Sequence, residues 1–298
     1  MVEVRVPASS ANIGPGYDSF GIALTMYNSI RVSETDSGLY IRNINPEGYI
    51  PLNDKNLVYR AVMRAFDEVG YSARGLKISQ KSDIPMTRGL GSSSACIVGG
   101  LVAGNIISGR KLTSQRIFEL ANELEGHPDN VAPALFGGFC ISCNDDGKLY
   151  RQTIRVSNEI KFVAMVPKYY VVTRKSRGLI PDMISTEDAA YNLSHAAGMA
   201  VSFATGNYKN LSVYCKDRIH QQYRKTVVED LEDIIEKSLN FGALAAYLSG
   251  SGPTVIAIIN GDDNDFVNKI TDYFSDKQIN RDCVLLNCDN AGTVAVER

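Results

Sequence analysis

The chain has 298 residues, of which 44% are hydrophobic and 21% charged, the composition of an ordinary soluble globular protein with a sizeable core. Its formal net charge is −2 and it has no long basic run, which argues against a nucleic-acid partner. No segment approaches about 18 consecutive apolar residues, and the N-terminus alternates like a strand rather than a signal peptide, so we expect a cytoplasmic protein without a membrane span.

The first half of the chain predicts strands and helices around glycine-rich loops. Alternating apolar residues indicate strands over 1–7, within 27–44 and over 76–82. Apolar residues at helical spacing indicate an amphipathic helix over 54–70, which Gly70 closes.

Two more helices are predicted before the middle of the chain. Residues 92–108 are apolar on nearly all sides and include three glycines, which is typical of a buried helix that another backbone approaches closely. Residues 113–126 have an amphipathic pattern, with Thr113 or Ser114 as the N-cap.

The second half mixes both kinds of element again. The predicted elements are a buried strand over 160–167, helices over 186–206, 226–240 and 266–274, and a turn followed by a buried strand within 244–261. Because strands and helices mix without a strict βαβ rhythm, the fold class is predicted to be α+β. We place one lobe over residues 1–158 and a second over residues 159–298.

Residues 85–95, PMTRGLGSSSA, combine several signals of a phosphate-binding loop. The glycines permit positive φ and a close approach of ligand to backbone. The serines begin the buried helix, where the first N–H groups lack partners and the helix dipole is positive. The Lys of the usual GxxxxGK[ST] motif is absent, so Mg²⁺, the helix end and Arg88 would have to supply the positive charge. On these residues alone, a capped turn that binds nothing is the alternative.

Three other stretches gather polar residues in loops. PASSANIGPGYDSFGIAL (7–24) offers Asn12 and Asp18, EGHPDNVAPALFGG (125–138) places His, Asp and Asn close together, and LSGSGPTV (248–255) predicts a tight turn before a strand. Taken singly, each stretch is also explained by turn chemistry, which Asn, Asp and Gly serve well.

In their order along the chain, PASSANIGPGYDSFG, PMTRGLGSSSA, EGHPDNVAP and LSGSGPT resemble the motifs of the GHMP kinases, a superfamily named for galactokinase, homoserine kinase, mevalonate kinase and phosphomevalonate kinase. The first and third stretches resemble homoserine kinases in particular, as do TRKSRGLIP (173–181) and DRIHQQYR (217–224). The motifs run from residue 7 to residue 255 and span most of the chain.

The resemblance implies a two-lobed architecture, with an N-terminal nucleotide-binding lobe and a C-terminal ferredoxin-like α/β-sandwich lobe. It implies ATP-dependent phosphorylation of the side-chain hydroxyl of L-homoserine to O-phospho-L-homoserine, a step of threonine biosynthesis that uses Mg²⁺. Members of the family are usually homodimers, so a homodimer is the expected assembly.

The resemblance also assigns the nucleotide and its metal to particular residues. The implied ATP contacts are Asn56 near the adenine and Pro85, Arg88, Gly89, Leu90, Gly91, Ser92, Ser93, Ser94 and Ala95 along the loop. The implied metal ligands are Ser93 and Glu119. Helical periodicity points Glu119 away from the apolar face of its helix, so its metal role requires that the outer face borders the cleft.

A second set of residues is implied to bind homoserine. These residues are Asn12, Asp18, Asn130, Thr173, Arg177 and Arg224. The chemistry of the set supports the assignment independently, because a zwitterion needs Arg for its carboxylate and a carboxylate for its ammonium. Galactose or mevalonate would not need two Arg and one Asp together.

Catalysis is expected to involve Asn130, Arg177 and Asp129. Either Asp129 is a general base, or Asn130 aligns the hydroxyl while Mg²⁺ and the helix end stabilise charge, which is the version we favour. His127 is expected to be structural. The sequence departs from the family pattern at Tyr17, where Phe is usual, and at Ser94, where Ala is frequent.

Two alternative functions stay open. The chain could be a GHMP kinase for another small alcohol, or a nucleotide-binding regulatory protein.

Overall fold

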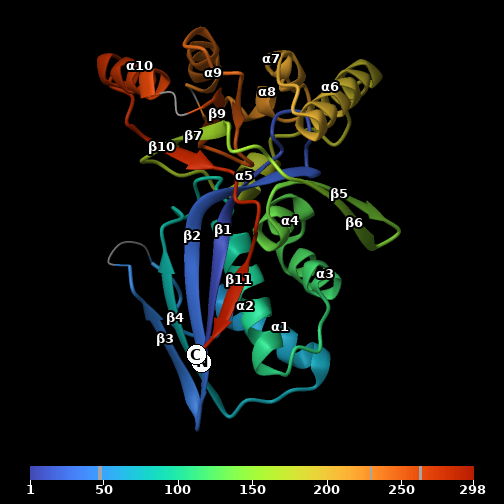
Figure 1. The fold of residues 1–298 in the computed structure, drawn as a ribbon, viewed down its shortest axis with the longest axis vertical. Helices are drawn as coiled ribbons and strands as arrows, with labels where there is room; N and C mark the ends of the chain where they lie inside the picture. Colours follow the sequence, from blue (N-terminus) through green and yellow to red (C-terminus); the bar gives the residue numbers. More distant parts are fainter. Residues whose placement is uncertain (46–48, 229, 262–263) are drawn as a thin grey trace.

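The structure is a computed structural model that describes residues 1–45, 49–228, 230–261 and 264–298. Its two lobes are stacked along the long axis of the molecule, and both chain ends lie together at the far end of the N-terminal lobe (Figure 1). Within those ranges, none of the helices is both long and apolar enough to cross a lipid bilayer.

A 7-stranded sheet forms the N-terminal lobe. Its strands are β1 (Val2–Ala11), β2 (Phe20–Thr35), β3 (Gly38–Asn43), β4 (Gly75–Ser82), β5 (Phe139–Asp145), β6 (Lys148–Ile154) and β11 (Val294–Glu297). The long strands β1 and β2 pair antiparallel, and the β5–β6 hairpin branches from β2. The last strand, β11, pairs with β1. The chain therefore returns to the first sheet after it has built the second lobe. A division of the chain at residue 158 assigns β11 to the C-terminal lobe, whereas its pairing with β1 makes it part of the N-terminal sheet.

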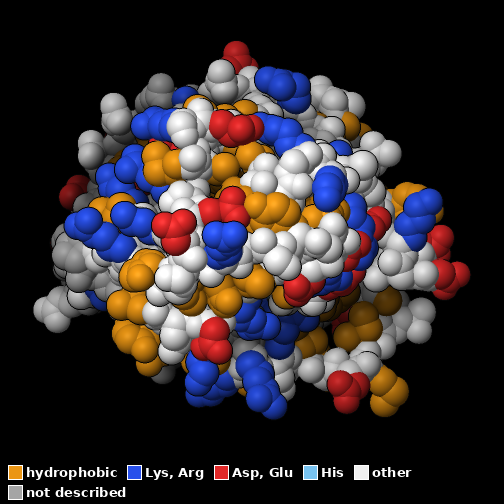
Figure 2. Space-filling model, turned by 90° about the horizontal axis from the view of Figure 1, so that it is seen from below, with side chains coloured by type: hydrophobic (Ala, Val, Ile, Leu, Met, Phe, Trp, Pro, Cys, Tyr) orange, Lys and Arg blue, Asp and Glu red, His pale blue; other side chains and the backbone are white. Residues whose placement is uncertain are grey.

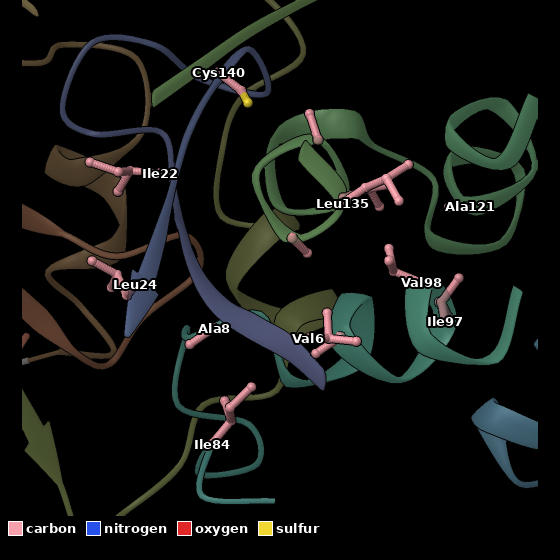
Figure 3. Close-up of a cluster of buried hydrophobic side chains, with 14 of the residues drawn as sticks. Val6, Ala8, Ile22, Leu24, Ile84, Ile97, Val98, Ala121, Leu135 and Cys140 are labelled. Atoms are coloured by element: carbon pink, nitrogen blue, oxygen red, sulfur yellow. The ribbon is translucent and has the colours of Figure 1, made fainter. Parts of the chain in front are cut away.

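Four helices cover one face of this sheet (Figure 1). They are α1 (Leu57–Val69), α2 (Ser92–Ile107), α3 (Ser114–Glu125) and α4 (Pro128–Phe136). Helices α2 and α4 pack against β1, and α1 packs against α2. Figure 3 shows how Val6 of β1, Val98 of α2 and Leu135 of α4 come together in the buried cluster. This core fixes the N-terminus of α2 beside the end of β1.

Local signals in the sequence account for the helix ends of this lobe. The side chain of Asn56 accepts two backbone N–H groups at the start of α1, which ends at Gly70 with a φ of 66°. The Thr113 side chain accepts one N–H group at the start of α3. The helices predicted over 54–70, 92–108 and 113–126 are confirmed. The helix end at Gly70 and the N-cap at Thr113 are confirmed as well.

The glycines of α2 let the α1 backbone approach closely. A Cβ atom at Gly100 would lie 2.6 Å from the backbone oxygen of Val58 and 2.6 Å from the Ala61 Cβ. We expect Gly100→Ala to destabilise the protein by roughly 1–3 kcal/mol, because the helix backbones must move apart. Gly99→Ala is the matched control, since its closest contact is the movable Ile30 Cδ1. Equal losses in urea unfolding would contradict this account.

The C-terminal lobe is built on a 4-stranded antiparallel sheet in the order β10-β7-β9-β8. Its strands are β7 (Ile160–Pro167), β8 (Ala245–Leu248), β9 (Val255–Asn260) and β10 (Arg281–Asn287). In chain order this is a 4-1-3-2 arrangement, and α9 (Leu231–Asn240) and α10 (Asn264–Asp276) pack on the sheet. The lobe is therefore a ferredoxin-like α/β sandwich, and the α+β fold class is confirmed.

The remaining helices lie between the two sheets and at the side of the second lobe (Figure 1). They are α5 (Thr173–Arg177), α6 (Thr186–Thr205), α7 (Leu211–Tyr214) and α8 (Gln221–Arg224). The short helices α5 and α8 bring basic residues toward the junction of the lobes. The opposite end of the molecule, seen in Figure 2, intersperses basic and acidic side chains among neutral and hydrophobic ones.

Candidate active site between the lobes

A cavity of about 140 Å³ lies where loops of both lobes meet. Its lining residues are Asn12, Asp18, Thr87, Arg88, Gly89, Leu90, Gly91, Ser92, Ser93, Glu125, His127, Asp129, Asn130, Thr173, Arg177, Arg224, Gly250 and Ser251. They come from the loop after β1, the glycine loop before α2, the α3–α4 junction, α5, α8 and the β8–β9 turn. Six segments of the chain therefore build one pocket.

The glycine loop is held open by contacts with both lobes. Gly89 and Gly91 have φ angles of 78° and 68°, a region that favours glycine. A Cβ atom at Gly89 would lie 2.3 Å from the backbone oxygen of Ser249, so only glycine fits there. The N-cap position of α2, Gly91, provides no side-chain hydrogen bond to the first turn. The first turn of α2 thus lacks a side-chain cap and borders the pocket, where its N–H groups are suited to bind an anion.

Arg88 braces this loop rather than pointing freely at a ligand. Its guanidinium donates to the backbone oxygens of Pro167 at 3.1 Å, Lys168 at 2.8 Å and Met86 at 2.9 Å. The Arg88 backbone oxygen also accepts from the Thr254 N–H group at 3.3 Å. Arg88 lines the pocket and, at the same time, ties the glycine loop to the second lobe.

The carboxylate that meets the loop serines belongs to Glu125, the last residue of α3. Ser93 Oγ donates to Glu125 Oε2 at 2.8 Å, and Ser94 Oγ donates to Glu125 Oε1 at 2.9 Å. Ser93 is exposed and lines the cavity, whereas Ser94 is fully buried. Of these two serines, Ser93 is therefore the one that can offer its hydroxyl to a ligand in the cleft.

The structure does not bring Glu119 to this pocket. Its carboxylate accepts from Gln115 Nε2 at 3.1 Å and from Arg116 Nη1 at 3.1 Å on the outer face of α3. These two hydrogen bonds hold the pKa of Glu119 below its ordinary value. At 3.6 residues per turn, Glu119 and Glu125 project from different faces of the helix, and the face that borders the cleft is the one that carries Glu125.

A tight loop after β1 presents Asn12 and Asp18 to the pocket. Both residues have positive φ angles, 69° and 54°, which are uncommon outside glycine. Asn12 Oδ1 accepts from the Asp18 N–H group at 3.1 Å, and Asn12 Nδ2 donates to the Gly250 oxygen at 3.1 Å. The carboxylate of Asp18 pairs with both terminal nitrogens of Arg177, one of them at 3.1 Å. Thr173, at the start of the same short helix, contacts Ser251 Oγ at 3.3 Å.

Arg224 is a buried cation beside the same pocket. It is 1% exposed, and burial lowers the pKa of its guanidinium. Its Nη1 donates to the Gly250 oxygen at 2.7 Å and approaches His220 Nδ1 at 3.1 Å, while its Nε atom has no hydrogen-bond partner among the described residues. Neither contact carries a negative charge. A buried cation at a cavity wall that makes no direct ion pair with a described residue favours an anionic ligand.

The α3–α4 junction supplies His127, Asp129 and Asn130. His127 Nδ1 lies 2.7 Å from Asp129 Oδ1, which also accepts from the Asn130 N–H group at 2.9 Å. Burial opposes the charged imidazolium, but the Asp129 carboxylate outweighs that effect and raises the pKa of His127. Ser9 Oγ donates to Asn130 Oδ1 at 2.9 Å, which fixes that side chain from β1. His127 lines the pocket, in addition to holding Asp129.

Four other predicted residues lie behind or beside the pocket. Asn56 is 2% exposed, and its amide group donates to the Pro51 oxygen and to Gln80 Oε1 besides capping α1. Ser94 and Ala95 are buried within α2. Pro85 lines a neighbouring cavity of about 390 Å³ that shares Thr87 and Arg88 with the central pocket.

The residues that sequence reasoning did not assign are Thr87, Glu125, Gly250 and Ser251. All four lie within stretches that the motif analysis had already quoted. Glu125 is the first residue of EGHPDNVAP, so its place in that motif was an available signal. Gly250 and Ser251 belong to LSGSGPT, which contributes backbone oxygens as well as a turn.

Known protein sequences are similar to this sequence over its whole length. The family model for the GHMP kinases N terminal domain matches residues 56–138, and the GHMP kinases C terminal model matches residues 199–276. A homoserine kinase from Clostridium beijerinckii is 45% identical over 100% of this chain and 99% of its own length. One from Caldicellulosiruptor saccharolyticus is 40% identical over 98% of this chain and 96% of its own.

Two solved structures have a fold similar to that of this chain over nearly its whole length. The crystal structure of homoserine kinase from Cytophaga hutchinsonii has a TM-score of 0.88 at 24% identity, and covers 99% of this chain and 97% of that one. The structure of a putative homoserine kinase from Listeria monocytogenes has a TM-score of 0.83 at 29% identity, with 100% of both chains covered. The chain belongs to the homoserine kinase family of the GHMP kinase superfamily.

Proposed function

We propose that the chain transfers the γ-phosphoryl group of ATP to the side-chain hydroxyl of L-homoserine and so forms O-phospho-L-homoserine in threonine biosynthesis. The observation that supports this function most strongly is the buried, uncompensated Arg224 in one pocket with the Asp18 carboxylate and the glycine loop. The pocket thus offers a cation for a carboxylate, an anion for an ammonium and a helix N-terminus for phosphates. For location and assembly we propose the cytoplasm and a homodimer, on the family resemblance alone.

In this proposal the ATP triphosphate lies over Gly89 to Gly91 and the first turn of α2, because N–H groups without side-chain partners face the cavity there. The base enters the neighbouring cavity along residues 82–88, where Ile50, Ile84 and Met86 supply apolar contacts. Asn56 then supports the nucleotide site from behind as the cap of α1.

The donor set at the start of α2 fits Mg²⁺. The ion prefers oxygen ligands, and it commonly binds one or two carboxylates together with substrate phosphates and water. Ser93 and Glu125 offer a hydroxyl and a carboxylate side by side. Within the described ranges no group of three or more His, Cys, Asp and Glu side chains is placed to hold a metal ion. We therefore propose Glu125, in place of Glu119, as the acidic ligand, and the bound ion would neutralise phosphate charge.

Homoserine is proposed to lie between the loop after β1 and helix α8. Its carboxylate lies at Arg224, because that guanidinium is buried and makes no ion pair with a carboxylate in the described part of the chain. Arg177 lines the same pocket, and both guanidinium carbons lie 5.6 Å from the centre of the Tyr17 ring. Its ammonium lies at Asp18 and Asn12. Thr173 then borders the same site from α5.

During phosphoryl transfer the residues of this chain mainly align the reacting groups and stabilise the charge on the phosphates. The homoserine oxygen attacks the γ-phosphorus, the bond from that phosphorus to the β–γ bridging oxygen breaks and releases ADP, and the hydroxyl proton passes to solvent. Asp129 Oδ1 already accepts from His127 and from a backbone N–H group. We therefore assign the alignment of the hydroxyl to Asn130, which Ser9 holds in place, and the stabilisation of charge to the α2 N-terminus.

An ADP-release assay with Mg²⁺ and ATP tests the function. L-Homoserine should be turned over, and mevalonate, galactose and shikimate should not. The amino alcohol 3-aminopropan-1-ol, which lacks the carboxylate, should lose roughly 100-fold or more in kcat/KM, because Arg224 would stay unpaired. Turnover of another alcohol without turnover of homoserine would refute the substrate, and ATP binding without substrate-stimulated ADP release would indicate a regulatory protein.

A further inference from the structure

We propose that His220 is a positioning residue that holds the Arg224 guanidinium toward the carboxylate of the substrate. This inference rests on the proposed function and extends it to a side chain outside the pocket. His220 is 0% exposed and is not part of the cavity wall. It precedes helix α8, and Arg224 is the last residue of that helix. The two side chains therefore leave the same turn of the chain.

The two partners of the imidazole allow one tautomer. Nε2 lies 2.8 Å from the Gly14 backbone oxygen, which can only accept a hydrogen bond. Nδ1 lies 3.1 Å from Arg224 Nη1, which can only donate. The proton therefore resides on Nε2, and the lone pair of Nδ1 accepts from the arginine. A doubly protonated ring would turn an N–H group toward the guanidinium.

The surroundings of His220 keep it neutral. Burial is the largest influence and lowers the pKa of His220, and the positive charge of Arg224 acts in the same direction. The Asp217 carboxylate opposes them, with its Oδ2 atom 3.7 Å from Nε2. The acceptor that faces Arg224 is therefore present throughout the neutral pH range.

Arg224 depends on this acceptor for its orientation. Within the part of the chain that the structure describes, Nη1 makes both hydrogen bonds of the guanidinium, to the Gly250 oxygen and to His220 Nδ1, and Nε makes none. The Tyr17 ring packs against both groups, with 5.6 Å to the imidazole centre and 5.6 Å to the guanidinium carbon. Without the His220 acceptor, one hydrogen bond to a backbone oxygen would be left to fix the buried end of the arginine.

Asp217 supports the position of His220 through the backbone. Its carboxylate accepts N–H groups from Ile219, His220 and Gln221 at 2.7–3.0 Å, and the Asn192 amide of helix α6 at 2.8 Å. These bonds fix the turn from which the imidazole projects. The contacts thus run from α6 through Asp217 and His220 to the substrate site.

Two substitutions at His220 separate positioning from packing. In His220→Asn the amide oxygen can take the place of Nδ1 and accept from Arg224, whereas in His220→Gln the amide nitrogen takes the place of Nε2 and binds only Gly14. We expect the Asn variant to keep its KM for L-homoserine within roughly 3-fold. The Gln variant should raise that KM roughly 10-fold to 100-fold, with kcat and the KM for ATP nearly unchanged.

Steady-state kinetics and thermal melting of both variants test the inference. Equal losses in the two variants, or a larger loss in the Asn variant, would overturn it. A fall in kcat, ATP affinity and melting temperature together would assign His220 a structural role and would also overturn it.

The carboxylate-free alcohol 3-aminopropan-1-ol supplies a second readout. Its kcat/KM should be the same in the Gln variant and in the wild-type enzyme, because it offers nothing for Arg224 to bind. A parallel loss on both alcohols would overturn the inference. Failure of the wild-type enzyme to phosphorylate homoserine would instead refute the proposed function, so the two failures are distinguishable.

Discussion

An Arg224→Met enzyme is expected to lose roughly 100-fold to 1,000-fold in kcat/KM for L-homoserine, while its affinity for ATP stays within about 3-fold of the wild-type value. Arg224 is buried at the pocket, and its observed partners are a backbone oxygen and a neutral imidazole. In the variant the substrate carboxylate would lose its water without gaining a cation. Steady-state kinetics with varied homoserine at saturating ATP measures the effect.

Arg218→Met is the matched control for this prediction. Arg218 belongs to the same DRIHQQYR segment, but its side chain is 41% exposed and pairs with Glu187 and Asp188 on α6. We expect kcat/KM to stay within about 2-fold, because exposed ion pairs contribute little. The Arg224 variant should also fold, since removal of an uncompensated buried charge offsets the lost hydrogen bonds. An unchanged KM for homoserine in a folded Arg224→Met enzyme would remove this residue from the site.

The contrast between these two arginines could not be predicted from local sequence. DRIHQQYR reads as the polar start of a helix, where an arginine is usually exposed. The structure makes α8 a helix of 4 residues, and contacts with Gly250, His220 and Tyr17 bury its last side chain. Burial of so short an element depends on elements that are distant in the chain. The family resemblance, rather than periodicity, was therefore the source of the Arg224 assignment.

Elements whose signals are local were predicted well. The amphipathic period of α1, its stop at Gly70 and the Thr113 cap of α3 are all determined by neighbouring residues. The pairing of β11 with β1, in contrast, could not be predicted from the sequence. Its register with β1, Val2 opposite Glu297, joins the two ends of the chain, and a strand pattern of four residues does not specify its partner.

The expected metal ligand, Glu119, and the proposed one, Glu125, differ for a related reason. Glutamates recur along α3, and helical periodicity shows only that Glu119 lies off the apolar face. Which face borders the cleft depends on how α3 packs against α2. The helix ends at Gly126, with a φ of 94°, and this stop leaves Glu125 beside the first turn of α2. Periodicity can exclude a residue from the core, but it does not choose between two residues outside it.

We expect Glu125→Gln to lower kcat roughly 100-fold or more, and Glu119→Gln to leave it within about 2-fold. The glutamine at position 125 keeps the size of the side chain and an acceptor for one serine, so the lost property is the negative charge that a divalent cation requires. Glu119 accepts hydrogen bonds from Gln115 and Arg116 on the outer face of its helix. Initial rates measured against free Mg²⁺ at saturating substrates should show a raised Mg²⁺ requirement in the first variant alone.

Calorimetric titration with ADP, in the presence and absence of Mg²⁺, gives a readout that does not depend on turnover. The wild-type enzyme and Glu119→Gln should bind ADP more tightly when Mg²⁺ is present, and Glu125→Gln should lose most of that difference. A large loss at Glu119 with little change at Glu125 would contradict the assignment and return the metal to the outer face of α3.

The loop serines extend the same test to the hydroxyl ligand. Both hydroxyls donate to Glu125, but Ser93 is exposed at the pocket and Ser94 is fully buried. Ser94→Ala removes a hydrogen bond to the carboxylate without removing a group that a ligand in the cleft can reach. Ser93→Ala removes that group. If Ser93 and Glu125 hold the ion together, Ser93→Ala should raise the Mg²⁺ requirement as Glu125→Gln does, and Ser94→Ala should not.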